Sequence, residues 1–124
     1  MDKKIVLVVE DDRNIRDLYV SALEMEDLEV HGAENGVEGV TLALALHPDL
    51  ILMDIVMPNM DGHSAVEEIR KDDWGKDAHI LYLTNKNDAD NLVKATELGT
   101  DEYVLKINTP IKELVQKVKD KLGI

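Results

Sequence analysis

The sequence contains no cysteine and no phenylalanine, and only 3% of its residues are aromatic. Without cysteine, the chain has neither a disulfide framework nor a thiol nucleophile. This absence fits a reducing compartment, so we expect a cytoplasmic protein. Without phenylalanine, the core must be built mainly from aliphatic side chains.

Positive charge is scarce as well. Fourteen Lys and Arg residues stand against 26 Asp and Glu residues, so the formal net charge is −12. Because the phosphates of nucleic acids need cations opposite them, this balance argues against direct binding to nucleic acid. The N-terminal apolar run Ile5–Val9 is too short for a signal peptide or a membrane span. We therefore expect neither nucleic acid nor membrane as a direct partner.

The remaining composition is that of a globular domain. The chain has 124 residues, of which 44% are hydrophobic and 32% are charged. A chain of this size buries a substantial core as one domain. It contains no linker and no low-complexity segment. We therefore predict a single domain over residues 1–124, with no output domain.

Five strand-like runs alternate with five helical patterns. The predicted strands lie near residues 5–9, 28–31, 50–54, 80–83 and 103–105. The predicted helices lie near residues 13–25, 37–47, 65–69, 92–99 and 111–122, and Thr109 and Pro110 suit the cap and the first turn of the last one. Such alternation predicts an α/β fold with a parallel sheet and helices on both faces. For five strands, we expect the flavodoxin-like doubly wound order 2-1-3-4-5.

Polar residues follow or end four of the predicted strands. They are Glu10, Asp11, Asp54, Thr84 and Lys106. Taken singly, each has an ordinary structural explanation, as a helix-start acid, a turn residue or a surface lysine. In parallel sheets, however, the carboxyl ends of the strands share one edge, and ligands bind there. Their joint placement therefore predicts a functional site, whereas Asp12 is assigned to capping the first helix.

Four segments together resemble a known family. They are Val8–Asp12, Leu52–Gly62, Leu83–Thr84 and Tyr103–Lys106. In this combination they resemble the receiver domain of two-component response regulators, over nearly the whole chain. The resemblance implies a phosphorylation-dependent signalling switch rather than an enzyme. Its expected partners are a histidine kinase or histidine phosphotransfer protein and a downstream target protein, and its expected state is a monomer or weak dimer.

The resemblance implies that Asp54 accepts the phosphoryl group. It also implies that Glu10 and Asp11 hold Mg²⁺ or Mn²⁺ together with Asp54 and the backbone carbonyl of Val56. Elementary electrostatics agrees with this assignment. Each pair of carboxylates at about 4 Å repels by about 4 kcal/mol at an effective dielectric constant near 20, and a divalent cation relieves that repulsion. Mg²⁺ suits a site with few carboxylates and a phosphate oxygen.

The resemblance also assigns a switch. Thr84 is the switch hydroxyl, Tyr103 the switch aromatic residue, and Lys106 the lysine that pairs with the phosphoryl group. An ammonium and a hydroxyl suit the phosphoryl oxygens that face away from the metal. Phosphorylation is then expected to draw Thr84 and Tyr103 inward and to change the surface of the fourth helix, fifth strand and fifth helix.

Two alternatives from other functional classes stay open. An aspartate-dependent phosphatase would use the same nucleophile, but that class needs a second Asp two residues later, where this chain has Val56. The other alternative is a degenerate receiver that acts as an unphosphorylated interaction module. The intact acid set argues against it, whereas Ile107, at a position where the family usually has Pro, keeps it open.

The loop after Lys106 departs from the family pattern. Ile107 and Asn108 stand where receivers usually have Pro and then Phe. A cis peptide before Ile costs about 2.5–4 kcal/mol, so we expect a trans bond and a differently shaped loop. Asn85 also replaces the small residue that usually follows the switch Thr, and we expect it to narrow access to Asp54.

Three residues are expected to tune the lifetime of the phosphorylated state. Val56 and Lys86, each two residues beyond a site residue, flank the approach of water in receivers, and Asn85 adds bulk. The branched apolar side chain of Val56 cannot hold a water molecule. The solvated ammonium of Lys86 acts weakly at physiological salt. We therefore expect slow autodephosphorylation.

The substitution Val56→Asn should accelerate hydrolysis of the phosphorylated protein about tenfold, which corresponds to about 1.4 kcal/mol. The amide can hold a water molecule near the phosphoryl group, which Val56 cannot do. The decay of the phosphorylated species, followed by intact mass, measures this rate. A wild-type half-life of seconds that the substitution leaves unchanged would contradict the prediction.

Overall fold

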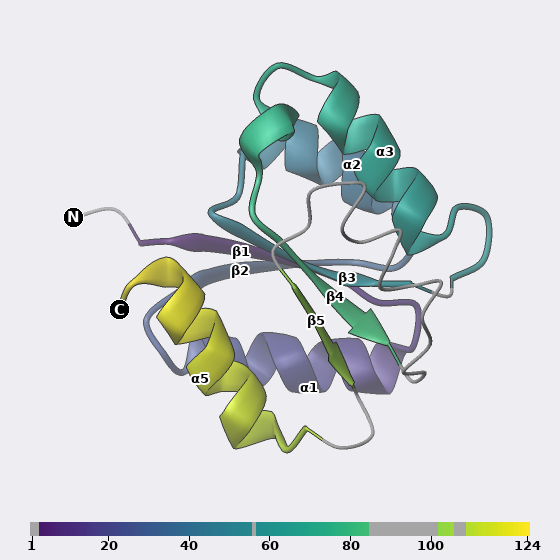
Figure 1. Cartoon of the computed structure of the whole chain (residues 1–124). Helices are drawn as coiled ribbons and strands as arrows, with labels where there is room; N and C mark the ends of the chain where they lie inside the picture. Colours follow the sequence, from purple (N-terminus) through teal and green to yellow (C-terminus); the bar gives the residue numbers. More distant parts are fainter. Residues whose placement is uncertain (1–2, 56, 85–101, 106–108) are drawn as a thin grey trace.

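The chain forms a parallel five-stranded sheet in the order β2-β1-β3-β4-β5, as the computed structural model shows (Figure 1). The structure describes residues 3–55, 57–84, 102–105 and 109–124. Of residues 84, 102, 103 and 105 it describes the backbone alone. The strands are β1 (Ile5–Val9), β2 (Glu29–Ala33), β3 (Leu50–Asp54), β4 (Ile80–Thr84) and β5 (Glu102–Leu105). The α/β class and the strand order predicted from the sequence are confirmed.

Helices cover both faces of the sheet. They are α1 (Arg13–Glu24), α2 (Gly36–Leu46), α3 (Gly62–Lys71), the short 3₁₀ helix η1 (Gly75–Asp77) and α5 (Ile111–Leu122). Helices α1 and α5 lie on one face, and α2 and α3 lie on the other (Figure 1). The helix predicted near residues 92–99 lies outside the described residues. Within the described part of the chain, no helix has the length and apolar character needed to cross a membrane.

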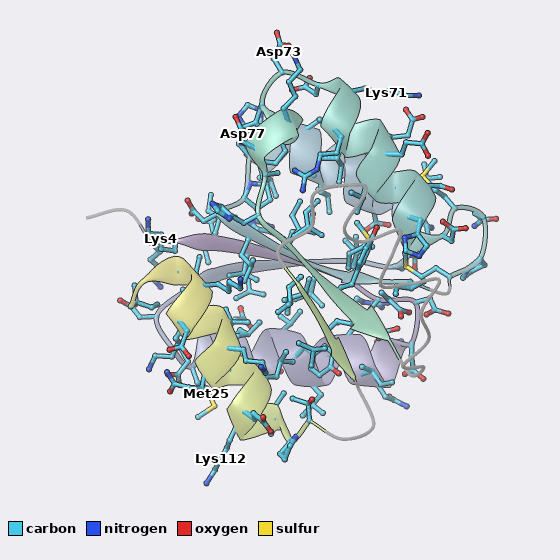
Figure 2. All side chains as sticks on the ribbon, in the orientation of Figure 1. Lys4, Met25, Lys71, Asp73, Asp77 and Lys112 are labelled. Atoms are coloured by element: carbon cyan, nitrogen blue, oxygen red, sulfur yellow. The ribbon has the colours of Figure 1, made fainter. Side chains whose placement is uncertain are left out.

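Alternating strand residues build two apolar layers. Side chains facing α2 and α3 include Leu7, Val9, Ile51, Met53, Ile80 and Tyr82. Side chains facing α1 and α5 include Val6, Val8, Leu50, Leu52, Leu81 and Leu83. Strands covered on both faces need such continuous apolar runs. By contrast, the charged side chains of Lys71, Asp73 and Lys112 project outward into solvent (Figure 2).

Two helix ends agree with the local sequence signals. Asp12 caps α1, because its side chain accepts hydrogen bonds from the backbone N–H groups of Asn14 and Ile15. Helix α2 ends at Leu46, and His47 takes a left-handed conformation with φ 50°. Pro48 follows, and proline disfavours a helical conformation in the residue before it. Capping by Asp12 and termination before Pro48 are therefore both confirmed.

Two element boundaries differ from the prediction. Strand β2 runs over Glu29–Ala33 rather than 28–31, because Leu28 packs into the α1/α5 layer and pairing begins at Glu29. Helix α5 has Pro110 as its N-cap, one residue later than the predicted Thr109. The Pro110 carbonyl begins the helical hydrogen bonding, and no side chain caps this end. Shifts of one or two residues are common at the ends of such elements.

Trp74, for which the sequence suggested no role, is half-buried against the α2/α3 layer. Its ring stacks on His47, with ring centroids 4.6 Å apart and planes inclined by 9°. The stack joins the end of α2 to the segment after α3. Its role is therefore packing at the end of the molecule remote from the polar strand ends.

Gly62, the first residue of α3, has no room for a side chain. A Cβ atom there would lie 2.3 Å from the carbonyl oxygen of Asp54 and 2.9 Å from the Cα of Ile55. The contact is with backbone, which cannot rotate away as a side chain can. The helix therefore begins in direct contact with the end of β3.

The substitution Gly62→Ala should destabilise the fold by about 1–3 kcal/mol through this overlap, although alanine is the better helix former. For a domain of this size, each kcal/mol lowers Tm by about 3–5 °C. Thermal unfolding measures the effect. Ser64→Ala, at an exposed position of the same helix, is the control and should change stability by no more than about 0.5 kcal/mol. Equal Tm values for the two variants would contradict the assignment.

Candidate functional site

Three carboxylates meet at the carboxyl edge of the sheet. Asp54 ends β3, and Glu10 and Asp11 follow β1, the neighbouring strand. One carboxylate oxygen from each residue lies within 4.8 Å of the other two. Glu10 is fully buried and Asp54 is 4% exposed, whereas Asp11 faces solvent. The sequence prediction that these residues converge is confirmed.

Backbone hydrogen bonds and one arginine hold Glu10 in place. Its backbone N–H donates to the carbonyl of Ala33 in β2 at 3.0 Å. Its carboxylate oxygen Oε2 accepts from the backbone N–H of Asp12 at 3.1 Å. Its backbone carbonyl accepts from Nη1 of Arg16 at 2.9 Å. The first turn of α1 and the end of β2 therefore both fix this carboxylate.

The loop after Asp54 turns back on itself to start α3. The N–H of Ile55 donates to the carbonyl of Leu83 at 3.2 Å, which extends the pairing with β4 past Asp54. The N–H of Gly62 then donates to the carbonyl of Ile55 at 2.8 Å and closes the loop. Asp61 caps α3 by accepting from the N–H of Ser64. Asp54 is thus anchored by strand pairing on one side and by the start of α3 on the other.

Tyr82 and His63 form a polar bridge between β4 and α3. Nδ1 of His63 lies 3.0 Å from the Tyr82 hydroxyl, and the rings meet edge-on with centroids 4.9 Å apart. Burial raises the pKa of Tyr82 well above its usual value, and the negative charge of Asp61 adds to this. The phenol therefore stays protonated at neutral pH. Because the folded-state pKa is raised, its contribution to stability is lost only at strongly alkaline pH.

The other predicted site residues are described less fully. Thr84 ends β4, where its backbone pairs with Leu105 of β5, and Tyr103 lies in β5 opposite Tyr82. The strand order therefore brings the end of β4 beside Asp54. The predicted residues that lie outside the described part of the chain are Val56, Asn85, Lys86, Lys106, Ile107 and Asn108.

The chemistry of this cluster suits a hard divalent cation. Three carboxylates with oxygens within 4.8 Å of one another repel, and the burial of Glu10 and Asp54 limits screening by water. Mg²⁺ is commonly held by oxygen ligands from a few carboxylates, with water molecules and phosphate oxygens completing its coordination. The sequence-based prediction of Mg²⁺ or Mn²⁺ therefore fits the residues that the structure brings together.

Comparison with known proteins agrees with the fold and the cluster. Residues 6–119 match the response regulator receiver domain family. The chain therefore belongs to this family. Its members are signalling domains of two-component systems rather than enzymes, and they bind Mg²⁺ at an acidic pocket.

Relatives of this chain include transcriptional regulators. The transcriptional regulatory protein ResD of Bacillus subtilis is 40% identical over 114 residues, which cover 92% of this chain and 46% of ResD. The probable transcriptional regulator ycf27 of Cyanophora paradoxa is 36% identical over 122 residues, which cover 98% of this chain and 49% of the relative. The chain thus spans about half the length of these curated relatives.

Solved structures with the same fold include chemotaxis proteins. Chemotaxis protein CheY4 of Vibrio cholerae superposes with a TM-score of 0.90 at 25% identity, covering 96% of this chain and 98% of that one. A CheY-like receiver domain protein of Methanospirillum hungatei JF-1 also gives a TM-score of 0.90 at 30% identity, with coverages of 98% and 95%. Fold similarity therefore extends over essentially the whole chain.

Sequence reasoning missed Arg16, which binds the backbone of Glu10, and the contact of His63 with Tyr82 between α3 and β4. Each resembles an ordinary helix or strand residue in the sequence. Their partners lie on other elements or outside regular structure, so no local spacing marks them. Only the packing of α1 and α3 on the sheet brings these partners together.

Proposed function

We propose that this chain is a phosphorylation-dependent signalling switch in which Asp54 accepts a phosphoryl group from a histidine kinase or a histidine phosphotransfer protein. The observation that carries the proposal is the convergence of Glu10, Asp11 and Asp54 at the strand ends. Membership of the receiver domain family supports it.

The proposed reaction uses Asp54 as a nucleophile. A carboxylate oxygen attacks the phosphorus of a phosphohistidine as the phosphorus–nitrogen bond breaks. The imidazole nitrogen leaves with the bonding electron pair and is then protonated, and Asp54 becomes an acyl phosphate. Hydrolysis reverses the change: a water oxygen attacks phosphorus, the bond to Asp54 breaks, and inorganic phosphate leaves.

Glu10, Asp11 and Asp54 are the side chains that would hold the divalent cation, with the carbonyl of Val56 assigned to it from the sequence. When bound, Mg²⁺ supplies charge neutralisation for the oxygens of the transferring phosphoryl group. The N–H of Asp12 holds the Glu10 carboxylate in place. The enclosed position of Asp54 restricts water around the acceptor oxygen.

We assign the response to phosphorylation to Thr84, Tyr103 and Lys106, as the sequence suggests. The backbone of Thr84 ends the strand beside Asp54, and β5 is hydrogen-bonded to that strand. A new phosphoryl charge at Asp54 would pair with Lys106 and draw in the Thr84 hydroxyl. The signal then passes to the surface that includes β5 and α5, where a downstream protein binds.

The acid cluster also weighs against the two alternatives. An unphosphorylated interaction module has no need for three carboxylates in mutual repulsion, two of them buried. A phosphatase needs a general acid two residues after Asp54, where the sequence has Val56. The phospho-switch uses every member of the cluster.

Incubation with acetyl phosphate and Mg²⁺ should add a single phosphoryl group, about 80 Da by intact mass. The Asp54→Asn variant should gain nothing, because an amide is not a nucleophile of this kind. Chelation of the metal should abolish uptake by the wild-type chain. The matched control is Asp12→Asn, which removes the same charge nearby, keeps a good helix cap and should leave uptake intact.

The proposal is overturned if Asp54→Asn still gains the mass, or if a chelator leaves the uptake undiminished. If Asp12→Asn also failed to gain the phosphoryl group, the total negative charge of the site, rather than Asp54 as a nucleophile, would control the reaction.

Phosphorylation should also change backbone amide exchange on the face that includes β5 and α5 more than on α2. The expected cause is that movements of Thr84 and Tyr103 alter that face directly. Helix α2 lies across the sheet from α5 (Figure 1). Hydrogen exchange with and without acetyl phosphate measures the difference, and Asp54→Asn supplies the unphosphorylated control. Equal changes on both faces, or none near Tyr103, would contradict this route.

A further inference from the structure

Arg16 reaches from α1 to the peptide group that joins two of the clustered acids. Its Nη1 donates to the backbone carbonyl of Glu10 at 2.9 Å, in a half-buried position. That carbonyl belongs to the peptide unit between Glu10 and Asp11. Because a peptide unit is planar, fixing its oxygen also fixes the direction in which the chain enters Asp11. The bond therefore acts on the relative placement of two carboxylates.

The side chain of Arg16 packs against Gly32 of the edge strand β2. A Cβ atom at Gly32 of β2 would lie 3.2 Å from Cδ of Arg16 and 3.4 Å from its Cγ. Carbon atoms in ordinary contact lie at about 3.5–4.0 Å. The methylenes of Arg16 thus lie directly over Gly32 on their way to Glu10. The edge strand, α1 and the acid cluster are joined through this one side chain.

We propose that Arg16 is a positioning residue for the divalent-cation site. By holding the Glu10 carbonyl, its guanidinium keeps the Asp11 carboxylate in register with those of Glu10 and Asp54, and Gly32 leaves the space it needs. This inference rests on the proposed function, in which those three acids hold the cation. Arg16 itself contacts neither the cation nor the phosphoryl group.

A purely electrostatic role for Arg16 predicts the opposite sign. A guanidinium near three carboxylates lowers their attraction for a second cation, so removing its charge should tighten Mg²⁺ binding. Removing a group that holds ligands in place should weaken binding, typically about tenfold or more. The direction of the change in affinity therefore separates the two roles.

The experiment compares Mg²⁺ affinity in the full chain by calorimetric titration, with amide shifts of Asp11 followed by NMR. Arg16→Gln should weaken Mg²⁺ binding about tenfold. The matched control is Arg13→Gln, which removes the same charge from the first turn of α1. Arg13 is exposed and pairs with Asp17 at 3.8 Å. This control should bind Mg²⁺ at least as tightly as the wild-type chain.

A second variant perturbs Arg16 without changing it. Gly32→Ala displaces the Arg16 methylenes and should weaken Mg²⁺ binding about threefold, an effect that should vanish when Arg16→Gln is already present. The backbone of Gly32 is not left-handed, so alanine is tolerated there. If Arg16→Gln fails to fold, the test is the Mg²⁺ affinity of Gly32→Ala alone, and an unchanged affinity would overturn the positioning role.

Equal or tighter Mg²⁺ binding by Arg16→Gln would overturn the positioning role. An effect of Gly32→Ala that persists in the Arg16→Gln background would overturn it too. Failure of the proposed function looks different: the wild-type chain would then bind no Mg²⁺, or Asp54→Asn would leave Mg²⁺ affinity unchanged.

Discussion

The burial of two carboxylates side by side is the constraint on which the rest of this structure depends. Glu10 and Asp54 lie at the ends of adjacent strands with almost no solvent exposure, and Asp11 adds a third charge at the rim. Buried charges are tolerated only where hydrogen bonds or counter-charges compensate them. The N–H of Asp12 compensates Glu10, and among the described residues no buried side-chain nitrogen or oxygen lacks a partner. A divalent cation bound between these carboxylates would relieve the repulsion that remains among them.

Because the carboxylates must be held at fixed distances, the elements around them make close contacts with one another. The start of α3 touches the backbone of Asp54 through a glycine, and the loop between them closes by a backbone hydrogen bond. Tyr82 in β4 and His63 in α3 hold the adjoining helix against the sheet. Two apolar layers, one beneath α1 and α5 and the other beneath α2 and α3, pack against the two faces of the sheet. A small displacement of any of these elements changes the distances between the acids.

The same scaffold serves relatives with different outputs. The matched regions belong to proteins named as transcriptional regulators and as chemotaxis proteins, at 25–40% identity. What they share with this chain is the fold and the family. A shared fold does not fix the function of a protein, because function depends on the sites and surfaces that the fold carries.

The sequence by itself determined the alternation of strands and helices, the apolar layers and, given the strand order common for five strands, the convergence of Glu10, Asp11 and Asp54. Continuous apolar runs of strand length, alternating with helical patterns, indicate buried parallel strands, and the carboxyl ends of such strands share an edge. Local signals also predicted the cap at Asp12 and the end of α2 before Pro48. Only the tertiary structure decided the start of α5, the packing of Trp74 on His47, and the contacts of Arg16 and Tyr82. These depend on groups from separate elements meeting in space, and no spacing along the chain encodes which carbonyl an arginine will reach.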